Sequence, residues 1–274
     1  MGTEVVIRVR HPFRSHLSRH RLCRRLDSAE VTLVGDFFRA VIKLLRECTN
    51  PRAGQHPSFP SPPSTETVMI LYYAPGGCSL ADHIALIETG LPYKLVKVER
   101  SKRTEDGRDF TMINPKGFIP ALELDDGSVL TENLAILVYI AHQAGALLPG
   151  DGLDRWRALE ATSFMTTELH GNFRPFFHAD ATQAERDKAR KLLVKHFATI
   201  AEQLGDRPFL VGDRMTIADP YLVVMLMWAG KNEIEVPERL TGYLAQMQKM
   251  PSVARALADE GLSLNPRQWF TDQR

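Results

Sequence analysis

The sequence predicts a small α/β domain followed by an all-helical domain. In residues 68–147, strand-like apolar runs alternate with segments of helical periodicity, in the order β-α-β and then β-β-α. The dipeptides Pro-Gly and Asp-Gly at residues 149–152 mark the end of this domain. From residue 153 to residue 262 the pattern is helical, which predicts a second domain built only from helices.

Composition narrows the class of protein. The chain has 274 residues and is 44% apolar, enough for two domains with real cores. No apolar run approaches the roughly 20 residues that cross a bilayer, so we expect no membrane segment. Three cysteines, an odd number, cannot build a disulfide framework and favour a reducing compartment such as the cytoplasm.

Residues 1–67 form an extension unlike the rest of the chain. Residues 1–66 hold 11 Lys and Arg against 6 Asp and Glu, whereas the remainder holds 23 against 27. Residues 54–67 are rich in Pro and Ser and are typical of a linker. A disordered segment or an over-extended gene start explains this composition, and a targeting or nucleic-acid-binding arm is the alternative. Residues 263–274 are predicted to be a tail.

The first strand and helix are centred on Cys78. Residues 68–73 are strand-favouring, Pro75-Gly76-Gly77 forces a turn, and helical periodicity then continues to Gly90. Cys78 therefore stands where free backbone N–H groups and the helix dipole favour a thiolate, its own or that of a bound thiol. The alternative is a small residue at a tight turn. Ser79, Tyr72 and Tyr73 are further candidate donors to a bound thiolate.

The remaining elements follow from similar signals. Strands are expected at 93–98, 121–124 and 128–131, the last two joined by an Asp-Gly hairpin turn, with a helix from Glu132. In the helical domain we expect one long helix over 156–177 and an apolar, central helix over 221–228. A further helix shows one apolar face, made by Leu193, Phe197, Ile200 and Leu204. Thr216 and Asp219 have the spacing of a capping box.

Three further positions can carry chemistry. A cis peptide bond at Ile119-Pro120 would present the Ile119 backbone to a peptide-like ligand, and an ordinary trans turn is the alternative. Glu132 and Asn133 open a helix and can receive a ligand's charged groups, or only complement the helix dipole. His170 shares a polar stripe with Ser163 and Thr167, which can also be a solvated face. No metal-ligand spacing and no glycine-rich phosphate loop appears, so no metal site is expected.

From Met69 to about Leu262 the chain resembles the bacterial glutathione transferases of the cysteine-containing beta class. The resemblance rests on an ordered set of motifs: LYYAPGGCSLA at 71–81, TEDG at 104–107, INPKGFIPAL at 113–122, LDDGS at 124–128, LTEN at 130–133, TTELH at 166–170 and FLVGDRMTIAD at 209–219. It does not include residues 1–66.

The resemblance implies a thioredoxin-like N-terminal domain, an all-helical C-terminal domain, a homodimer, and glutathione as co-substrate. It implies that Cys78 contacts the glutathione sulfur, with Ser79 as a second donor, and that His170 faces it from the second domain. It assigns the remaining contacts with glutathione to Ile119, to a cis-proline at Pro120, to Glu132, Asn133, Ser163 and Thr167, and to Lys102 or the neighbouring Arg103. Gly171 departs from the family pattern, which often has lysine there.

We therefore expect a transferase that conjugates glutathione to small hydrophobic electrophiles held near Phe173, Phe176 and Phe177. Disulfide exchange through Cys78 is one alternative, and a non-catalytic protein that binds glutathione or a hydrophobic ligand is another. No nucleic-acid or membrane partner is expected.

Overall fold

The computed structural model describes residues 68–263, which lie within one compact unit, Ser64–Arg274. The predictions for residues 1–67 and for positions 264–274 of the tail lie outside the described residues.

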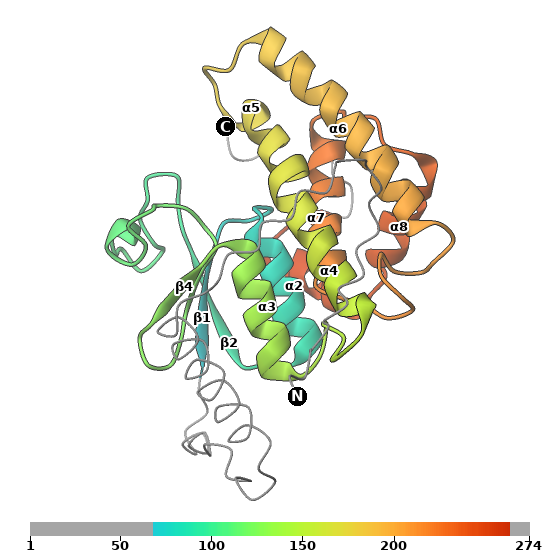
Figure 1. Cartoon of the computed structure of the whole chain (residues 1–274). Coiled ribbons are helices and arrows are strands. Elements are labelled where there is room, and N and C mark those ends of the chain that lie inside the picture. The colour runs from blue at the N-terminus through green and yellow to red at the C-terminus, as the bar shows by residue number, and fades with distance from the viewer. Residues whose placement is uncertain (1–67, 264–274) are drawn as a thin grey trace, which may run out of the picture. The chain divides into compact units, whose positions relative to one another are not determined.

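A four-stranded mixed sheet forms the framework of the first domain (Figure 1). β1 (Met69–Tyr73) pairs in parallel with β2 (Tyr93–Lys97) and antiparallel with β3 (Ala121–Glu123), which pairs antiparallel with β4 (Val129–Thr131). The strand order is β2-β1-β3-β4. The predicted β-α-β and β-β-α order, and with it the thioredoxin-like arrangement, is confirmed.

Side chains of β1 alternate between two hydrophobic clusters. Leu71 and Tyr73 join the main core, on the side where α2 (Ser79–Thr89) and α3 (Asn133–Ala144) pack together. Tyr72 points the other way, where Phe110 of the short helix η1 (Phe110–Met112) lies with Val98 and Ala121. Because successive side chains of β1 pack on opposite faces of the sheet, the strand is held on both sides. Its end, where the chain enters the loop before Cys78, is therefore fixed in position.

The second domain is helical, as predicted. Its elements are α4 (Leu153–Phe164), η2 (Met165–His170), α5 (Gly171–Phe177), α6 (Gln183–Leu204), α7 (Ala218–Lys231), α8 (Glu238–Met247) and α9 (Pro251–Asp259). Every residue of α7 from Ala218 to Ala229 is buried, which confirms the expected central helix. The four apolar residues predicted to form one face of α6 are all 0% exposed. Burial of each such side chain contributes roughly 2 kcal/mol.

Two local predictions needed correction. The expected helix over 156–177 is interrupted, because η2 is a turn of π-helix between α4 and α5. Half of the expected capping box is present: Asp219 Oδ2 accepts from the Thr216 backbone N–H over 2.7 Å, but α7 begins only at Ala218. Asp219 also accepts from the Tyr243 hydroxyl over 2.7 Å, so it ties α7 to α8. None of the helices within residues 68–263 is both long enough and apolar enough to span a membrane.

Candidate active site

The loop between β1 and α2 is held tightly against the loop that carries Ile119. Gly76 has φ of 65°, and the Gly77 N–H donates to the Ala74 carbonyl over 2.8 Å. A Cβ on Gly77 would lie 2.9 Å from Ile119 Cδ1 and 3.0 Å from the Ala74 oxygen. Glycine at position 77 therefore lets the two loops approach without displacing the end of the Ile119 side chain, and this approach brings Cys78 to Ile119.

Cys78 caps α2, and its Sγ donates to the Ile119 carbonyl over 3.6 Å. The residue is 7% exposed. Burial first, and then the nearby Asp82 carboxylate, raise the pKa of the Cys78 thiol to about 12. Of the two alternatives for this helix terminus, burial therefore disfavours a thiolate on Cys78 itself and leaves the thiolate of a bound thiol. In this environment the residue is a neutral thiol, which can donate a hydrogen bond to an anion.

The other predicted donors near Cys78 point elsewhere. Ser79 is fully buried, and its hydroxyl is engaged with the Ala74 backbone, accepting from N–H over 3.3 Å and donating to C=O over 3.4 Å. The Tyr72 hydroxyl donates to Glu123 over 2.5 Å on the opposite face of the sheet, and the Tyr73 ring packs beside the His83 ring. We therefore do not place these three side chains in the cleft.

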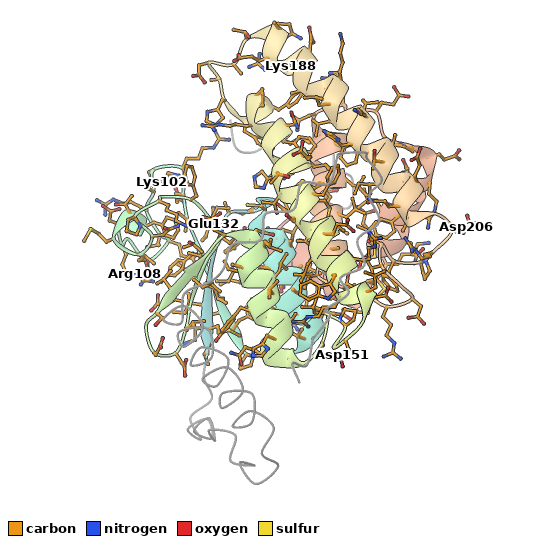
Figure 2. All side chains as sticks on the ribbon, viewed as in Figure 1. Lys102, Arg108, Glu132, Asp151, Lys188 and Asp206 are labelled. Carbon is orange, nitrogen blue, oxygen red and sulfur yellow. The ribbon has the colours of Figure 1, made fainter. Side chains whose placement is uncertain are left out.

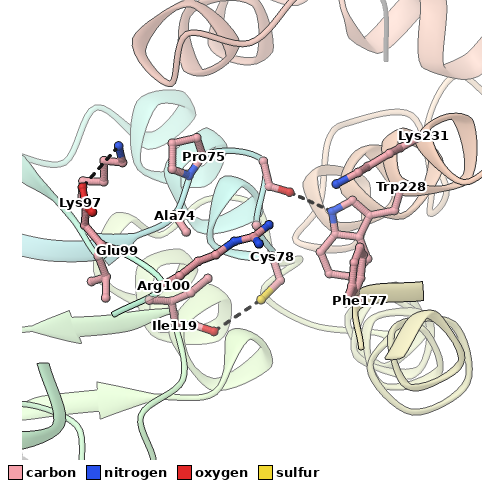
Figure 3. A pocket seen from close by; sticks show the side chains of 13 residues that line it. Ala74, Pro75, Cys78, Lys97, Glu99, Arg100, Ile119, Phe177, Trp228 and Lys231 are labelled. Atoms are coloured by element: carbon pink, nitrogen blue, oxygen red, sulfur yellow. Dashed lines mark hydrogen bonds and ion pairs between the residues drawn. The ribbon is translucent and has the colours of Figure 1, made fainter. Parts of the chain in front are cut away.

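Two cavities meet at Cys78 and Ile119. The larger, cavity A, has a volume of about 490 Å³ and is the one drawn in Figure 3. Its wall from the helical domain is made by Phe177, Trp228 and Lys231. The smaller, cavity B, has a volume of about 300 Å³ and is lined by Cys78, Asn114, Lys116, Phe118, Ile119, Pro120, Thr131, Glu132, Asn133, Thr166, His170, Gly171 and Tyr221.

In cavity B, the Ile119-Pro120 peptide bond is cis. The ladder between β1 and β3 begins at Ala121, so Ile119 lies just outside the strand register. Glu132 has φ of 77° and an exposed side chain that pairs with Lys116 over 2.7 Å. Lys116 Nζ also contacts Thr131 Oγ1 over 3.0 Å. A charged cluster therefore stands at the start of α3, at one end of the cavity.

Asn133 lines cavity B, but its amide nitrogen is already engaged. Nδ2 donates to the Cys78 carbonyl over 2.7 Å and to Asp82 Oδ2 over 3.1 Å. The residue is 6% exposed. The Asn133 side chain thus joins the start of α3 to the first turn of α2, a structural role that sequence reading did not identify.

The helical domain contributes His170 and Tyr221 to cavity B. His170 Nδ1 lies 2.7 Å from the Tyr221 hydroxyl oxygen, and the His170 ring meets the Trp228 ring edge-on with centroids 5.0 Å apart. Burial lowers the pKa of His170, so the ring is neutral near pH 7. The predicted position of His170 opposite Cys78 agrees with this geometry, since both residues line the same cavity.

For the polar stripe beside His170, the structure favours the alternative of a solvated face. Ser163 and Thr167 are exposed and line neither cavity, whereas Thr166 does line cavity B. The stripe assumed regular α-helical spacing. The π-helical turn η2, which includes Thr166, Thr167 and His170, changes which residues share a face.

Lys102 also lines neither cavity, although it lies over the ring of Phe118, which lines cavity B. It has φ of 63°, its Nζ donates to the Gly117 carbonyl over 2.7 Å, and it lies 5.7 Å from the Phe118 ring centroid. In Figure 2 it stands on the long connection between β2 and β3, apart from the start of α3 at Glu132.

Sequence reasoning missed the residues that tie the two domains together. Trp228 Nε1 donates to the Gly76 carbonyl over 2.8 Å, and Glu260 Oε2 accepts from the Gly76 N–H over 2.8 Å. Glu260 Oε1 also lies 3.0 Å from His83 Nδ1.

Of the three predicted aromatic wall residues, only Phe177 lines a cavity; Phe173 is 0% exposed and belongs to the core. Only long-range contacts reveal these roles, so no local sequence signal would have found them.

Over the described part of the chain, no group of three or more His, Cys, Asp or Glu side chains is placed to hold a metal ion.

Comparisons with known proteins identify the family. Residues 78–143 match the model of the glutathione S-transferase N-terminal domain, and residues 183–257 match that of the C-terminal domain. Glutathione S-transferase GstA of Escherichia coli O157:H7 is 40% identical over 200 residues, which cover 71% of this chain and 100% of that protein. A beta-class enzyme from Sphingomonas chungbukensis is 39% identical with a TM-score of 0.66, and a sphingomonad enzyme solved with glutathione is 40% identical with a TM-score of 0.65. Each of the two matches includes 71% of this chain and 100% of the chain in the solved structure. The chain belongs to the glutathione S-transferase family and resembles its bacterial beta class.

Proposed function

We propose that this protein is a glutathione transferase that joins the sulfur of glutathione to a carbon of a small, apolar electrophile. The observation that carries the proposal is the meeting of the two cavities at Cys78 and Ile119. Cavity B, with a volume of about 300 Å³, has the Lys116–Glu132 ion pair in its wall, and cavity A has an aromatic wall. A thiol bound in the first is thereby delivered to an electrophile in the second.

Glutathione fits cavity B in an extended form. Its γ-glutamyl end lies at the start of α3. There the Glu132 carboxylate accepts hydrogen bonds from the ammonium group of glutathione, and Lys116 and backbone N–H groups donate hydrogen bonds to its α-carboxylate. The backbone of Ile119, just before β3, pairs with the cysteinyl unit. The sulfur then lies beside Cys78 and faces His170. Lys102 is the predicted partner of the glycine carboxylate, which requires its side chain to leave the Gly117 carbonyl.

The chemistry follows from this placement. The thiol of glutathione releases its proton to solvent, and the resulting thiolate accepts hydrogen bonds from the neutral Cys78 thiol and from the N–H groups at the start of α2. Each unit by which these groups lower the thiol pKa corresponds to about 1.4 kcal/mol. The thiolate attacks the electrophilic carbon, a new S–C bond forms, and the leaving group departs with its electron pair, as chloride does from a chloronitroarene.

The test is conjugation of glutathione to a chloronitroarene, followed by absorbance. We expect the wild-type rate to exceed the uncatalysed rate, with Cys78→Ala losing about tenfold in kcat/KM because it cannot donate, and Cys78→Ser losing less. A wild-type rate equal to that in buffer would overturn the proposal.

Two alternative functions, disulfide exchange and binding without turnover, can be tested with the same purified protein. Disulfide exchange needs an accessible thiolate at Cys78, and the burial and raised pKa of this thiol argue against it. A disulfide-exchange assay that exceeds conjugation would reverse this preference. Retention on immobilised glutathione with no turnover of any electrophile would instead favour a binding protein.

We further propose that the protein is a cytoplasmic homodimer. Four large apolar side chains in the described chain are strongly exposed: Met112 83%, Phe118 71%, Leu153 65% and Trp156 63%. A partner copy would cover such side chains. Light scattering should give twice the mass of the chain, and a monomer at micromolar concentration would contradict this.

Cell fractionation tests the compartment, for which the free thiol of Cys78 is the supporting observation.

A further inference from the structure

Two buried polar side chains meet beside Cys78. Asp82 lies in the first turn of α2, and Asn133 is the first residue of α3, which packs against α2 (Figure 1). Asp82 is 0% exposed and Asn133 is 6% exposed. Asn133 Nδ2 donates to Asp82 Oδ2 over 3.1 Å and to the Cys78 carbonyl over 2.7 Å. Because a carbonyl oxygen can only accept, the contact with Cys78 fixes which atom of the amide is the nitrogen.

Each of these two side chains has one oxygen left over. Asp82 Oδ1 and Asn133 Oδ1 are buried, and within residues 68–263 neither has a hydrogen-bond partner. Two acceptors cannot satisfy each other, but a proton on Asp82 Oδ1 turns that oxygen into a donor. A carboxylic acid and a primary amide can then form two hydrogen bonds in one ring, from N–H to oxygen and from O–H to oxygen. A single proton thereby satisfies both atoms, as buried polar groups require.

The surroundings of Asp82 also favour the protonated acid. Burial raises the pKa of Asp82 well above its ordinary value, against a smaller lowering by its own backbone N–H. Cys78 on α2 and Tyr221 on α7 interact with Asp82 through space, and the raised pKa of each leaves it neutral near pH 7. Other ionisable side chains on the elements around α2 face elsewhere: Tyr73, Asp259 and Glu260 face His83, and Glu132 faces Lys116.

We propose that Asp82 keeps its proton near neutral pH and shares it with Asn133 in a cyclic acid–amide pair. Asp82 is then a positioning residue. The pair joins both ends of the glutathione site proposed above, since Asn133 follows Glu132 in the chain and its amide also holds the Cys78 carbonyl.

The pair also sets the charge behind the sulfur of glutathione. While Asp82 is protonated, it adds no charge beside Cys78. Loss of the proton at higher pH places a negative charge there, which opposes an anionic sulfur. This consequence rests on the transferase function proposed above, whereas the pair itself does not.

Infrared spectroscopy near pH 7 tests the proton directly. The spectrum of Asp82→Asn is subtracted from that of the wild type, so that other buried acids, such as Asp219 and Glu260, cancel. We expect the difference to contain the C=O stretching band of a protonated carboxylic acid. The control Asp125→Asn removes an exposed carboxylate and should give carboxylate bands instead. Carboxylate bands from Asp82, whether the anion is bare or hydrated, would overturn the proposal.

Unfolding in urea measures the same proton by linkage. In the unfolded chain Asp82 ionises near about pH 4, whereas the native protein retains the proton. The unfolding constant of the wild type, divided by that of Asp82→Asn, should therefore rise by about tenfold per pH unit above about pH 5, until native Asp82 ionises. Asp82→Asn should fold, because its amide can also pair with Asn133. A ratio that does not change with pH, as expected for Asp125→Asn, would reject the pair.

Two glutathione analogues test the consequence for the site. Glutathione sulfonate carries an anion at the sulfur, and S-methylglutathione is neutral there. Across the pH range in which the acid band disappears, the wild type should lose about tenfold in affinity for the sulfonate relative to the methyl analogue. Asp82→Asn should show no such loss in calorimetry. The same loss in both proteins rejects the effect of Asp82 on the sulfur. Binding of neither analogue rejects the proposed function, while the infrared and unfolding results still decide the pair.

Discussion

Nδ1 of His170 and the hydroxyl oxygen of Tyr221 lie 2.7 Å apart in the wall of the cavity that Cys78 also lines. Burial lowers the pKa of His170, while burial and the nearby Cys78 raise the pKa of Tyr221. Both groups are therefore neutral near pH 7. The phenol thus fixes the orientation of the imidazole ring rather than exchanging charge with it.

Tyr221→Phe should lower kcat/KM for conjugation by about fivefold, the equivalent of roughly 1 kcal/mol, because one hydrogen bond that orients His170 is lost. The KM for glutathione should change less than kcat. Steady-state kinetics with a chloronitroarene measures both constants. Tyr139→Phe, a tyrosine that lines neither cavity, is the control. Unchanged kinetics in Tyr221→Phe would show that the contact has no role in turnover.

Gly171→Lys should increase activity at low pH. Gly171 is helical, lines cavity B, and has open space where a Cβ would lie. A cation at this position favours the thiolate of glutathione and lowers its pKa, so the acid limb of the kcat/KM profile should move to lower pH. Gly171→Ala is the control; it stabilises the helix by up to about 1 kcal/mol and should leave the profile in place. A shift of equal size in both variants would contradict the electrostatic explanation.

Asp82→Asn should lower the pKa of the Cys78 thiol below its present value of about 12, because the Asp82 carboxylate is the second cause of that shift after burial. The asparagine keeps an oxygen to accept from Asn133 Nδ2. The rate of alkylation of Cys78 as a function of pH measures the effect. Asp125→Asn, an exposed carboxylate, should leave that dependence unchanged. If the two variants behave alike, Asp82 does not act on the thiol.

Glu260→Ala should destabilise the fold by about 2–4 kcal/mol, because the Gly76 N–H and His83 lose a buried acceptor. Glu260→Gln retains an amide oxygen for one of these bonds and should cost about 1 kcal/mol. Urea unfolding followed by circular dichroism measures both values. Equal losses in the two variants would mean that packing, and not hydrogen bonding, explains the effect.

The sequence predicted those features that depend on local periodicity. The order of strands and helices follows from period-2 and period-3.6 patterns, as in the buried face of α6. The position of Cys78 at a strand-to-helix turn follows from Pro75-Gly76-Gly77, because these residues can only form a turn there. The placement of His170 opposite Cys78 came from the family resemblance and not from spacing.

The errors concern features that depend on tertiary contacts. The sequence left open whether Cys78 or a bound thiol carries the negative charge, because burial outweighs the helix terminus at Cys78 and burial is not a local property. Ser163 and Thr167 do not share a cavity with His170, because a π-helical turn, which spacing does not reveal, changes which residues share a face. Trp228 was missed as a site residue since its partner, Gly76, is 152 positions away in the chain.

The indole of Trp228 touches the loop before Cys78, the imidazole of His170 and the ring of Phe177. Because indole emission depends on local polarity, Trp228 becomes an intrinsic optical reporter of both halves of the cleft once the other two tryptophans, Trp156 and Trp269, are replaced by phenylalanine. Filling either cavity alters what surrounds the chromophore, so the order in which the two ligands arrive can be followed by fluorescence without attaching any label.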